Sequence, residues 1–333
     1  MKNTCQYFLG EGRFELRSSE LKPLLADEVR IRNMAAGICG TDVHIFQGGE
    51  GSAPVKPPIV LGHEYAGEVV EIGSNVSTLG IGDHVTVDPN IYCGLCGPCR
   101  SGRKHNCENL IGIGINFDGG FAQYSTVPER QCYFLKPDLP YEVGAMAEPI
   151  ACCLHGIDLI HIRPGETVLI IGGGAIGLIM VQLARLSGAA VVTLSEPIAM
   201  RRAMGLQVGA DNAVDPLSIV DRVDVVIECA GCLEATEQAV VSAKAGGRVL
   251  LFSVPELHAK YPLPLFDVFK KELTIVGSFI NPDTHQRAVN LLNQGRLQIQ
   301  PIVTHRFPLR QVQDAVLAQM GNESIKVVVM PQD

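Results

Sequence analysis

Four cysteines stand close together in the segment YCGLCGPCRSGRKHNC, residues 92–107. Cys93, Cys96, Cys99 and Cys107 follow the pattern C-x2-C-x2-C-x7-C. Gaps of two residues let successive thiolates converge on one ion through tight turns, and the intervening glycines and proline supply those turns. Four sulfur ligands with no fifth candidate are typical of a closed tetrahedral zinc site, which stabilises a loop and leaves no position for a substrate.

The four cysteines have two other interpretations, namely free or disulfide-bonded thiols and an iron–sulfur cluster. The chain has eleven cysteines. This odd count in a long chain without a recognisable signal peptide favours a reducing compartment, where closely spaced cysteines bind metal more often than they form disulfides. Nothing else in the sequence resembles an electron-transfer protein, which disfavours the cluster. Structural zinc is therefore the favoured interpretation.

A second chemical signature is the glycine-rich segment GGGAIG, residues 172–177, with the spacing G-x-G-x-x-G. It follows a predicted strand and opens a predicted helix, as a dinucleotide-binding turn requires. Gly172 permits the tight turn, Gly174 lets a pyrophosphate approach the backbone, and Gly177 lets helix and strand pack closely. We assign these glycines and Ile176, in the same turn, to a cofactor site at the positive end of the helix.

An acidic residue completes this signature. In dinucleotide-binding folds it stands about 20 positions after the glycines, at the end of the second strand, and Glu196 stands nineteen residues after Gly177. A carboxylate there accepts hydrogen bonds from the adenosine ribose of NAD and repels the 2′-phosphate of NADP. The sequence therefore predicts NAD as the preferred coenzyme, although Arg201 and Arg202 are of a type that can hold such a phosphate.

The hydrophobic patterning indicates two domains that position these sites. From residue 29 to about 138, short β-rich segments separated by glycine and proline predict an irregular β-barrel-like domain. After residue 140, strands alternate with helices at short intervals, as in a doubly wound parallel sheet. In that half the patterning predicts a helix over 232–247 and strands over 248–254 and 272–279. We expect one domain over 1–150, completed by about 291–333, and a second over 151–290.

Composition limits the function classes. The 333 residues carry a net charge of −8 and are 47% hydrophobic, as in a globular protein with a large core. An acidic balance without a basic patch argues against nucleic-acid binding. The longest apolar run, residues 168–181, is shorter than the roughly 18 to 20 residues that span a bilayer and is interrupted by glycines. We expect a cytoplasmic protein with a small-molecule substrate and no nucleic-acid or membrane partner.

Other residues of suitable chemistry lie far apart in the sequence. Cys39, His63 and Glu64 precede the cysteine loop, and Glu148 follows it. By spacing alone, Cys39 reads as a small buried residue and His63 as an ordinary loop histidine. Only the fold can bring residues so distant in sequence together.

Several motifs occur in a fixed order along the chain, namely GICGTDVH, LGHEYAGEVVEIG, CGLCGPC, AEPIACCLHG, GGGAIG and THRFPL. Together they resemble the zinc-containing medium-chain dehydrogenase/reductase family over nearly the whole length, with sorbitol (polyol) and bacterial L-threonine dehydrogenases looking most similar. The resemblance implies an α/β plus β fold, with a GroES-like β-barrel catalytic domain and a Rossmann domain. It also implies a homotetramer or homodimer, for which the strands over 248–254 and 272–279 could supply sheet-edge contacts.

The resemblance further implies a catalytic zinc held by Cys39, His63 and one glutamate, with Glu64 and Glu148 as alternatives for the third position. One thiolate, one imidazole and one carboxylate leave zinc near neutral with an open position, where an alcohol becomes more acidic and can lose hydride to NAD.

By the same resemblance, Thr41 and His44 would carry the alcohol proton towards solvent, and Arg201 would pack over the adenine.

Departures from the relatives bear on the substrate. Ile45 stands where sorbitol dehydrogenases have a tyrosine, and Ile280 and Asn281 stand where they have Arg-Tyr. The Glu148-Pro149 pair is unusual for threonine-specific enzymes. The predicted reaction is hydride transfer between a secondary alcohol or polyol and NAD. Amino-alcohol oxidation of the L-threonine 3-dehydrogenase type and a non-catalytic dinucleotide-binding protein are the alternatives, while a zinc-free quinone reductase is disfavoured because both metal motifs are present.

Overall fold

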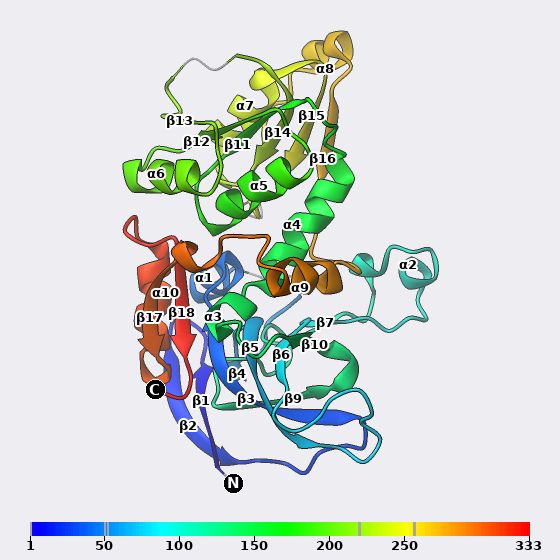
Figure 1. Ribbon diagram of the computed structural model, residues 1–333, viewed down its shortest axis with the longest axis vertical. Coiled ribbons are helices and arrows are strands. Elements are labelled where there is room, and N and C mark those ends of the chain that lie inside the picture. Colours follow the sequence, from blue (N-terminus) through cyan, green and yellow to red (C-terminus); the bar gives the residue numbers. More distant parts are fainter. Residues whose placement is uncertain (1, 50, 52, 219–220, 256–257) are drawn as a thin grey trace. The chain divides into compact units, whose positions relative to one another are not determined.

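The computed structural model describes residues 2–49, 51, 53–218, 221–255 and 258–333 (Figure 1). The chain divides into two compact units. One comprises Met1–Ala151 with Pro282–Asp333, and the other comprises Cys152–Asn281. The first division falls within helix α4 (Ala147–Ile160).

The first unit is built around a seven-stranded sheet with the order β10-β6-β5-β3-β18-β17, in which β9 also pairs with β3. The central strand β3 lies between β5 and β18 and is antiparallel to both. Two strands from the end of the chain, β17 and β18, thus share a sheet with strands from its beginning. The strands are β3 (Glu28–Gly37), β5 (Glu64–Ile72), β6 (His84–Val87), β9 (Tyr124–Pro128), β10 (Cys132–Leu135), β17 (Val303–Pro308) and β18 (Lys326–Met330).

Smaller elements complete this unit. A three-stranded sheet has the order β2-β1-β4, and β7 pairs with β8. These strands are β1 (Lys2–Phe8), β2 (Phe14–Glu20), β4 (Ile59–Val60), β7 (Asn90–Ile91) and β8 (Ile111–Gly112). The helices are α1 (Gly40–Phe46), α2 (Gly97–Arg100), α3 (Tyr141–Gly144), α9 (His285–Asn293) and α10 (Val312–Met320), with short 3-10 turns at Lys104–Asn106, Glu129–Gln131, Gln300–Ile302 and Leu309–Gln311.

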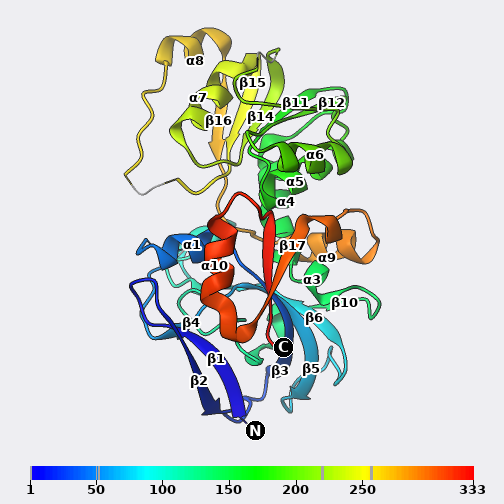
Figure 2. The same ribbon diagram turned by 90° about the vertical axis from the view of Figure 1, so that its left-hand side faces the viewer.

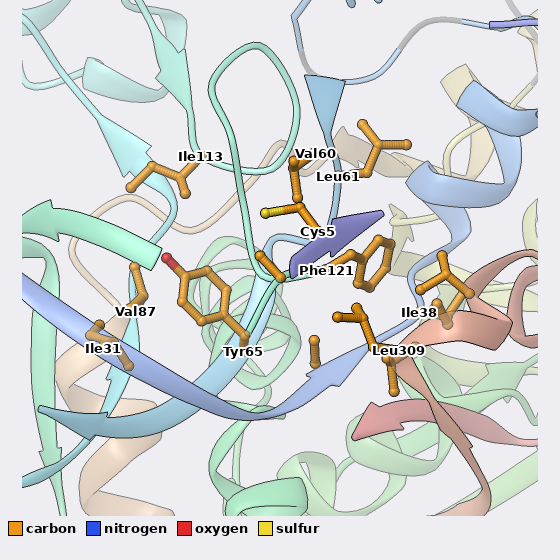
Figure 3. Packing of buried hydrophobic residues seen from close by; sticks show 14 of the residues in the cluster. Cys5, Ile31, Ile38, Val60, Leu61, Tyr65, Val87, Ile113, Phe121 and Leu309 are labelled. Atoms are coloured by element: carbon orange, nitrogen blue, oxygen red, sulfur yellow. The ribbon is translucent and has the colours of Figure 1, made fainter. Parts of the chain in front are cut away.

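The core of the first unit collects the apolar faces of these strands. Alternate residues of β3, such as Val29 and Ile31, point into a cluster that also contains the rings of Tyr65 and Phe121. Figure 3 shows Ile31, Tyr65 and Phe121 together with Leu309 from the far end of the chain. Burying aliphatic and aromatic groups from both chain ends is the main favourable term that holds the unit together.

The second unit is a six-stranded parallel sheet with the order β13-β12-β11-β14-β15-β16. In chain order this is 3-2-1-4-5-6, the arrangement of dinucleotide-binding doubly wound folds. Figure 2 shows α7 and α8 to one side of the sheet and α5 and α6 to the other. The strands are β11 (Thr167–Ile171), β12 (Val191–Ser195), β13 (Asn212–Val214), β14 (Val223–Glu228), β15 (Ala243–Leu251) and β16 (Thr274–Gly277), and the helices are α5 (Ala175–Leu186), α6 (Ala199–Gln207), α7 (Leu233–Ser242) and α8 (Leu265–Lys271). The predicted fold class is confirmed.

Two sequence-based details in this unit were wrong. The helix expected over 232–247 ends at Ser242, and β15 begins at Ala243. Its pairing with β14 shifts by several residues, from Val223↔Ala243 to Val225↔Arg248, and Gly246 within the shift has a φ of 74°. Moreover, β15 lies between β14 and β16, so of these last two strands β16 lies at an edge of the sheet and β15 does not. The expectation that residues 248–254 supply a sheet edge is therefore incorrect.

The segment Tyr141–Ile160 is as long and apolar as a membrane-spanning helix, but most of it is buried inside the protein. Core helices of soluble proteins have the same properties, so its length and composition are accounted for by packing.

A buried histidine makes the stability of the first unit depend on pH. His285, the first residue of α9, is 1% exposed, and its ring lies 4.7 Å from that of Tyr133. Neither ring nitrogen has a hydrogen-bond partner among the residues described. Burial lowers the pKa of His285 to about 3, because a charged imidazolium would lose its hydration without gaining a partner.

We therefore predict that acidification destabilises this unit through His285. The folded-state pKa lies below the unfolded value near 6.5, so the stabilisation is complete above that value and is lost as pH falls towards 3. Between pH 7 and 5 the loss is about 2 kcal/mol. His285→Phe keeps an aromatic ring against Tyr133 but cannot bind a proton. Chemical denaturation at both pH values should show a smaller decrease in the variant; an equal decrease would contradict the assignment.

Candidate functional site

The four cysteines of the loop converge. The ligand atoms of Cys93, Cys96, Cys99 and Cys107 all lie within 4.8 Å of one another, and the Sγ atoms of Cys96 and Cys107 are 3.9 Å apart. A zinc–sulfur bond of about 2.3 Å in a tetrahedron requires sulfur atoms about 3.8 Å apart. The set therefore has the size of a tetrahedral zinc site.

Backbone groups prepare these sulfurs for a metal. The N–H groups of Leu95 and Cys96 donate to Cys93 Sγ at 3.5 and 3.4 Å, and that of Asn109 donates to Cys107 Sγ at 3.4 Å. The donors from Leu95 and Cys96 lower the pKa of Cys93 to about 6, since hydrogen bonds to a thiolate favour its charged form. The loop thus holds a thiolate where a closed metal site needs one.

A second group of metal-binding side chains forms at the end of β3 and the start of β5. The ligand atoms of Cys39, His63 and Glu64 lie within 4.8 Å of one another. Cys39 is the N-cap of α1, directly after β3, and the register of the two strands pairs Gly37 with Glu64. Three donors of mixed type leave a further position free, which is the arrangement of catalytic zinc sites.

Several negatively charged side chains surround His63 in this second metal-binding group. Burial alone would lower the pKa of His63, but the negative charges of Asp42, Cys39 and Glu148 raise it well above its usual value. Glu148, at the start of α4, is itself buried. The structure therefore brings Glu148 into the electrostatic environment of His63, although it is not one of the three converging ligands. So many buried anionic groups need a cation, and a divalent metal ion fits.

Asp42 belongs to this site, although sequence reasoning did not assign it a role. One carboxylate oxygen, Oδ2, accepts the backbone N–H of Cys39 at 2.8 Å. The other, Oδ1, lies 3.8 Å from His63 Nδ1. The two atoms are too far apart for a hydrogen bond, but a carboxylate on the Nδ1 side of the ring favours Nε2 as the metal-binding nitrogen. The local signal was present, because Asp42 stands at the third helical position after the N-cap Cys39, where acidic residues cap helices.

Lys326 was also missed. It is the first residue of β18, and its ammonium forms a buried ion pair with Glu64. Burial alone would lower the pKa of Lys326, but the charges of Glu64, Cys39 and Asp42 raise it above its usual value, so the side chain keeps its proton. No local pattern could have revealed a partner 262 residues away in the sequence.

The expected proton relay residues lie on one helix. Thr41 and His44 are both in α1, three residues apart, and both are partly buried. Residues at this spacing share a helix face. Cys39 is the N-cap of this helix, so the hydroxyl group and the imidazole stand two and five residues after a candidate metal ligand in the chain.

In the second unit the glycine-rich turn has the properties that a dinucleotide requires. Gly172 has a φ of 98°, and a Cβ on Gly177 would lie 1.8 Å from the carbonyl oxygen of Gly172. A Cβ on Gly174, the N-cap of α5, would meet no protein atom within 4 Å. The turn is thus closed on the side of Gly177 and open at Gly174, where a pyrophosphate would approach the backbone. Ile176 lies in the first turn of the same helix.

Glu196 lies against this turn. It follows β12 directly, and its Oε2 accepts the backbone N–H of Gly173 at 2.5 Å, while its Oε1 accepts that of Ile198 at 2.8 Å. Arg202 donates to the carbonyl oxygens of Glu196 and Pro197, both at 2.7 Å. Arg201 is its neighbour in α6 and is partly buried. The acidic residue predicted from spacing therefore does contact the glycine-rich turn.

A second acidic residue, which the sequence did not reveal, supports the turn from the next strand. Glu228 ends β14, and its Oε1 accepts the N–H groups of Ala230 and Gly231 at 2.6 and 2.7 Å. The loop that contains Ala230 and Gly231 packs on Gly172. A Cβ on Gly172 would lie 3.0 Å from the backbone nitrogen of Ala230. A side chain at position 172 would therefore crowd this loop, in addition to the strain that its positive φ would cause.

Comparison with known proteins identifies relatives along the whole chain. Residues 25–138 match the model of the alcohol dehydrogenase GroES-like domain, and residues 175–294 match that of zinc-binding dehydrogenases. An L-threonine 3-dehydrogenase of Bacillus licheniformis is 35% identical over 91% of both chains. A sorbitol dehydrogenase of Bacillus subtilis is 33% identical over 92% of this chain and 90% of its own.

A solved structure of a protein described as a zinc-binding dehydrogenase from Sinorhizobium meliloti, bound to NADP, has a TM-score of 0.95 and 40% identity, covering 99% of this chain and 100% of that one. The resemblance drawn from the motifs is confirmed, as are zinc and a nicotinamide dinucleotide as the cofactors.

We predict two zinc ions per chain with separate roles. Cys39→Ser removes a ligand of the open group, so the protein should stay folded, retain one zinc and lose activity. Cys96→Ser removes a ligand of the closed group, so it should lower thermal stability before it affects turnover. Metal analysis, thermal unfolding and an activity assay of both variants check this. Loss of activity in both variants at full stability would show that the roles are not divided.

Proposed function

Because the chain belongs to the zinc-containing medium-chain dehydrogenase/reductase family, we propose that it transfers hydride between a secondary alcohol or polyol and NAD. The observation that carries this proposal is the open group of Cys39, His63 and Glu64, next to Glu148, in a chain that also has a dinucleotide turn. Zinc, when bound, polarises an alcohol and lowers the pKa of its hydroxyl group, and the nicotinamide accepts hydride.

The residues of the chain supply the rest of the chemistry. Cys39 and His63 hold the metal, and Asp42, on the Nδ1 side of the His63 ring, favours Nε2 as the metal-binding nitrogen. Thr41 accepts the hydroxyl proton of the substrate as it passes its own hydroxyl proton to His44, and the imidazole releases a proton towards solvent. Cys93, Cys96, Cys99 and Cys107 hold the structural zinc.

L-Threonine is the second candidate substrate. The similarity to L-threonine 3-dehydrogenases, at 35% identity, supports an amino alcohol as strongly as the sorbitol dehydrogenase similarity supports a polyol. Both substrates carry a secondary hydroxyl group and would use the same metal-binding residues. Only groups that contact the remainder of the substrate would distinguish them.

We predict that a panel of secondary alcohols, polyols and L-threonine includes at least one substrate whose oxidation depends on Glu148. Glu148→Gln keeps the size of the side chain and removes its charge, so the folded variant should lose turnover by roughly a hundredfold, as expected for a group that acts at the reacting centre. Initial rates of dinucleotide reduction and a thermal unfolding curve measure both properties. No oxidation across the panel would refute the reaction, whereas unchanged turnover in the variant would refute only the role of Glu148.

The coenzyme preference follows from Glu196. Its carboxylate lies beside the glycine-rich turn, where it would accept hydrogen bonds from the ribose of NAD and repel a 2′-phosphate. Arg201 and Arg202 offer positive charge nearby, but Arg202 already binds two carbonyl oxygens and lies 3.6 Å from Asp215. The similar zinc-binding dehydrogenase from Sinorhizobium meliloti was solved with NADP, the coenzyme that this proposal disfavours for the present chain.

We predict that kcat/KM with NAD exceeds that with NADP by at least roughly tenfold, which corresponds to about 1.4 kcal/mol. Glu196→Ser should narrow or reverse the ratio, because it removes the repulsive charge. Steady-state rates with both coenzymes at equal concentration measure it. Faster turnover of the unaltered protein with NADP would show that Glu196 does not set the preference.

The same family membership supports a homo-oligomer, a tetramer or a dimer. The edge strand β16 and the neighbouring helix α8 offer a surface for it, since Leu265, Phe266 and Phe269 are 73%, 70% and 78% exposed. Unpaired strand edges and clustered apolar side chains commonly mark contacts between chains. A monomeric mass by light scattering would contradict this proposal.

We place the enzyme in the cytoplasm. None of the eleven cysteines is paired in a disulfide, as expected in a reducing compartment. Cell fractionation that recovers the protein in an oxidising compartment would contradict this.

A further inference from the structure

A Cys-x-x-Cys pair lies at the end of one strand of the parallel sheet. Cys229 directly follows β14, and Cys232 is the N-cap of α7, with Ala230 and Gly231 between them. This spacing between a strand and a helix is typical of thiols that alternate between the dithiol and the disulfide form. The chemistry proposed above uses neither thiol.

Metal binding is the other chemistry that this spacing serves. Among the residues that the structure describes, the converging groups of three or more metal-binding side chains are the four-cysteine loop and the group of Cys39, His63 and Glu64. Neither group includes Cys229 or Cys232. Two thiols alone do not complete a zinc site, so redox chemistry accounts better for this pair.

The two thiols differ in their access to solvent. Cys232 is exposed, and within the described residues its thiol forms no capping hydrogen bond with α7. Cys229 is partly buried, and burial together with the neighbouring Glu228 carboxylate raises the pKa of its thiol well above the usual value. Cys232 is therefore the thiol that meets a dissolved oxidant first, and Cys229 is placed to react with the product.

The backbone between the two cysteines is bent. It bends at Ala230 and again at Cys232, and Gly231 has a φ of 80°. A four-residue bend can bring its ends within about 7 Å of each other, which is the range of Cα separations that a disulfide spans. A disulfide between residues 229 and 232 is therefore compatible with the local backbone.

This segment also packs on the dinucleotide turn. The N–H of Cys229 donates to the carbonyl oxygen of Ile171, the last residue of β11, at 2.8 Å. A Cβ on Gly172 would lie 3.0 Å from the nitrogen of Ala230 and 3.0 Å from the carbonyl carbon of Cys229. Because the space between the two segments is filled, a shift of one displaces the other, and the pyrophosphate of a coenzyme depends on the position of Gly172.

We propose that Cys229 and Cys232 form a reversible disulfide that weakens coenzyme binding when the protein is oxidised. Disulfides in reducing compartments are mostly transient and sense redox state, which agrees with two unpaired thiols in this structure. The inference rests on the proposed function for the role of the coenzyme, whereas the disulfide itself can be measured without one.

A peroxide is the oxidant. The sulfur of Cys232 attacks one oxygen of hydrogen peroxide, the O–O bond breaks, and a sulfenic acid and one water are formed. The sulfur of Cys229 then attacks the sulfur of the sulfenic acid, the S–O bond breaks, and a second water leaves with the thiol proton. Two thiols and one peroxide thus give one disulfide and two waters, and an added dithiol reverses the change by thiol–disulfide exchange.

The disulfide is measured in the full-length protein by mass spectrometry. Trypsin releases residues 223–244 as one peptide, which contains Cys229 and Cys232 and no other cysteine. After treatment with hydrogen peroxide and alkylation of the remaining thiols, we expect this peptide to carry no alkyl group and to be two hydrogen atoms lighter than the reduced peptide. Dithiothreitol should restore both alkylation sites. A peptide that is alkylated at both cysteines after peroxide treatment would overturn the inference.

Coenzyme binding is measured by titrating the reduced and the oxidised protein with NADH and, separately, with NADPH. The fluorescence of the reduced nicotinamide reports binding without a substrate. We expect oxidation to raise the Kd of the preferred coenzyme at least about fivefold, as for a typical coupling between two sites, and dithiothreitol to restore it. An unchanged Kd in protein that carries the disulfide would refute the coupling.

Two variants separate this disulfide from other effects of peroxide, such as oxidation of the zinc-binding thiolates. Cys232→Ser should fold, because serine is a favoured N-cap residue, and its Kd should not respond to peroxide. Cys132→Ser replaces a thiol of the other unit, whose Sγ lies 4.0 Å from the carbonyl oxygen of Pro128, and as the matched control it should respond as the unaltered protein does.

A peroxide effect on coenzyme binding that persists in Cys232→Ser would contradict the inference. Failure of the reduced protein to oxidise any alcohol would instead refute the proposed function alone, because the peptide mass and the Kd are both measured without a substrate.

Discussion

Buried negative charge is the constraint on which the first unit depends. Asp42 and Glu64 are almost fully buried, Cys39 converges with Glu64 in the metal-binding group, and its backbone N–H donates to Asp42. Ionised groups in a protein interior are stable only when they are paired or bound to a metal. Lys326 supplies one positive charge, and a zinc ion supplies the remainder. The strands that carry these residues therefore hold the buried charges close enough to neutralise one another.

The pairing of the strands explains how these charged residues come together. Cys39 comes directly after β3, Glu64 begins β5, and Lys326 begins β18. Antiparallel pairing places the end of β3 beside the starts of its two neighbours. Residues from three distant parts of the sequence meet at one corner of the sheet for this reason. The second unit also brings residues distant in sequence together at strand ends. Gly172, Glu196 and Glu228 lie at the carboxyl ends of neighbouring parallel strands.

How much the sequence could predict depended on the distance over which each interaction acts. The four-cysteine loop and the glycine-rich turn are local, and spacing alone indicated their geometry. The assignment of Cys39 and His63 needed resemblance, because only the fold joins them. Lys326 could not be found from any pattern, since a buried lysine in a strand looks like an ordinary surface residue. The early end of α7 was missed because helix-forming residues continue through Ala243 and Lys244, where pairing with β14 determines the conformation instead.

The most direct test of this charge balance is X-ray diffraction at the zinc absorption edge from crystals grown with zinc. The account predicts two anomalous peaks per chain, one among the four cysteines and one bonded to Cys39 Sγ and His63 Nε2. In the same density, Glu64 should still contact Lys326. An absence of metal at Cys39 and His63 would contradict the account.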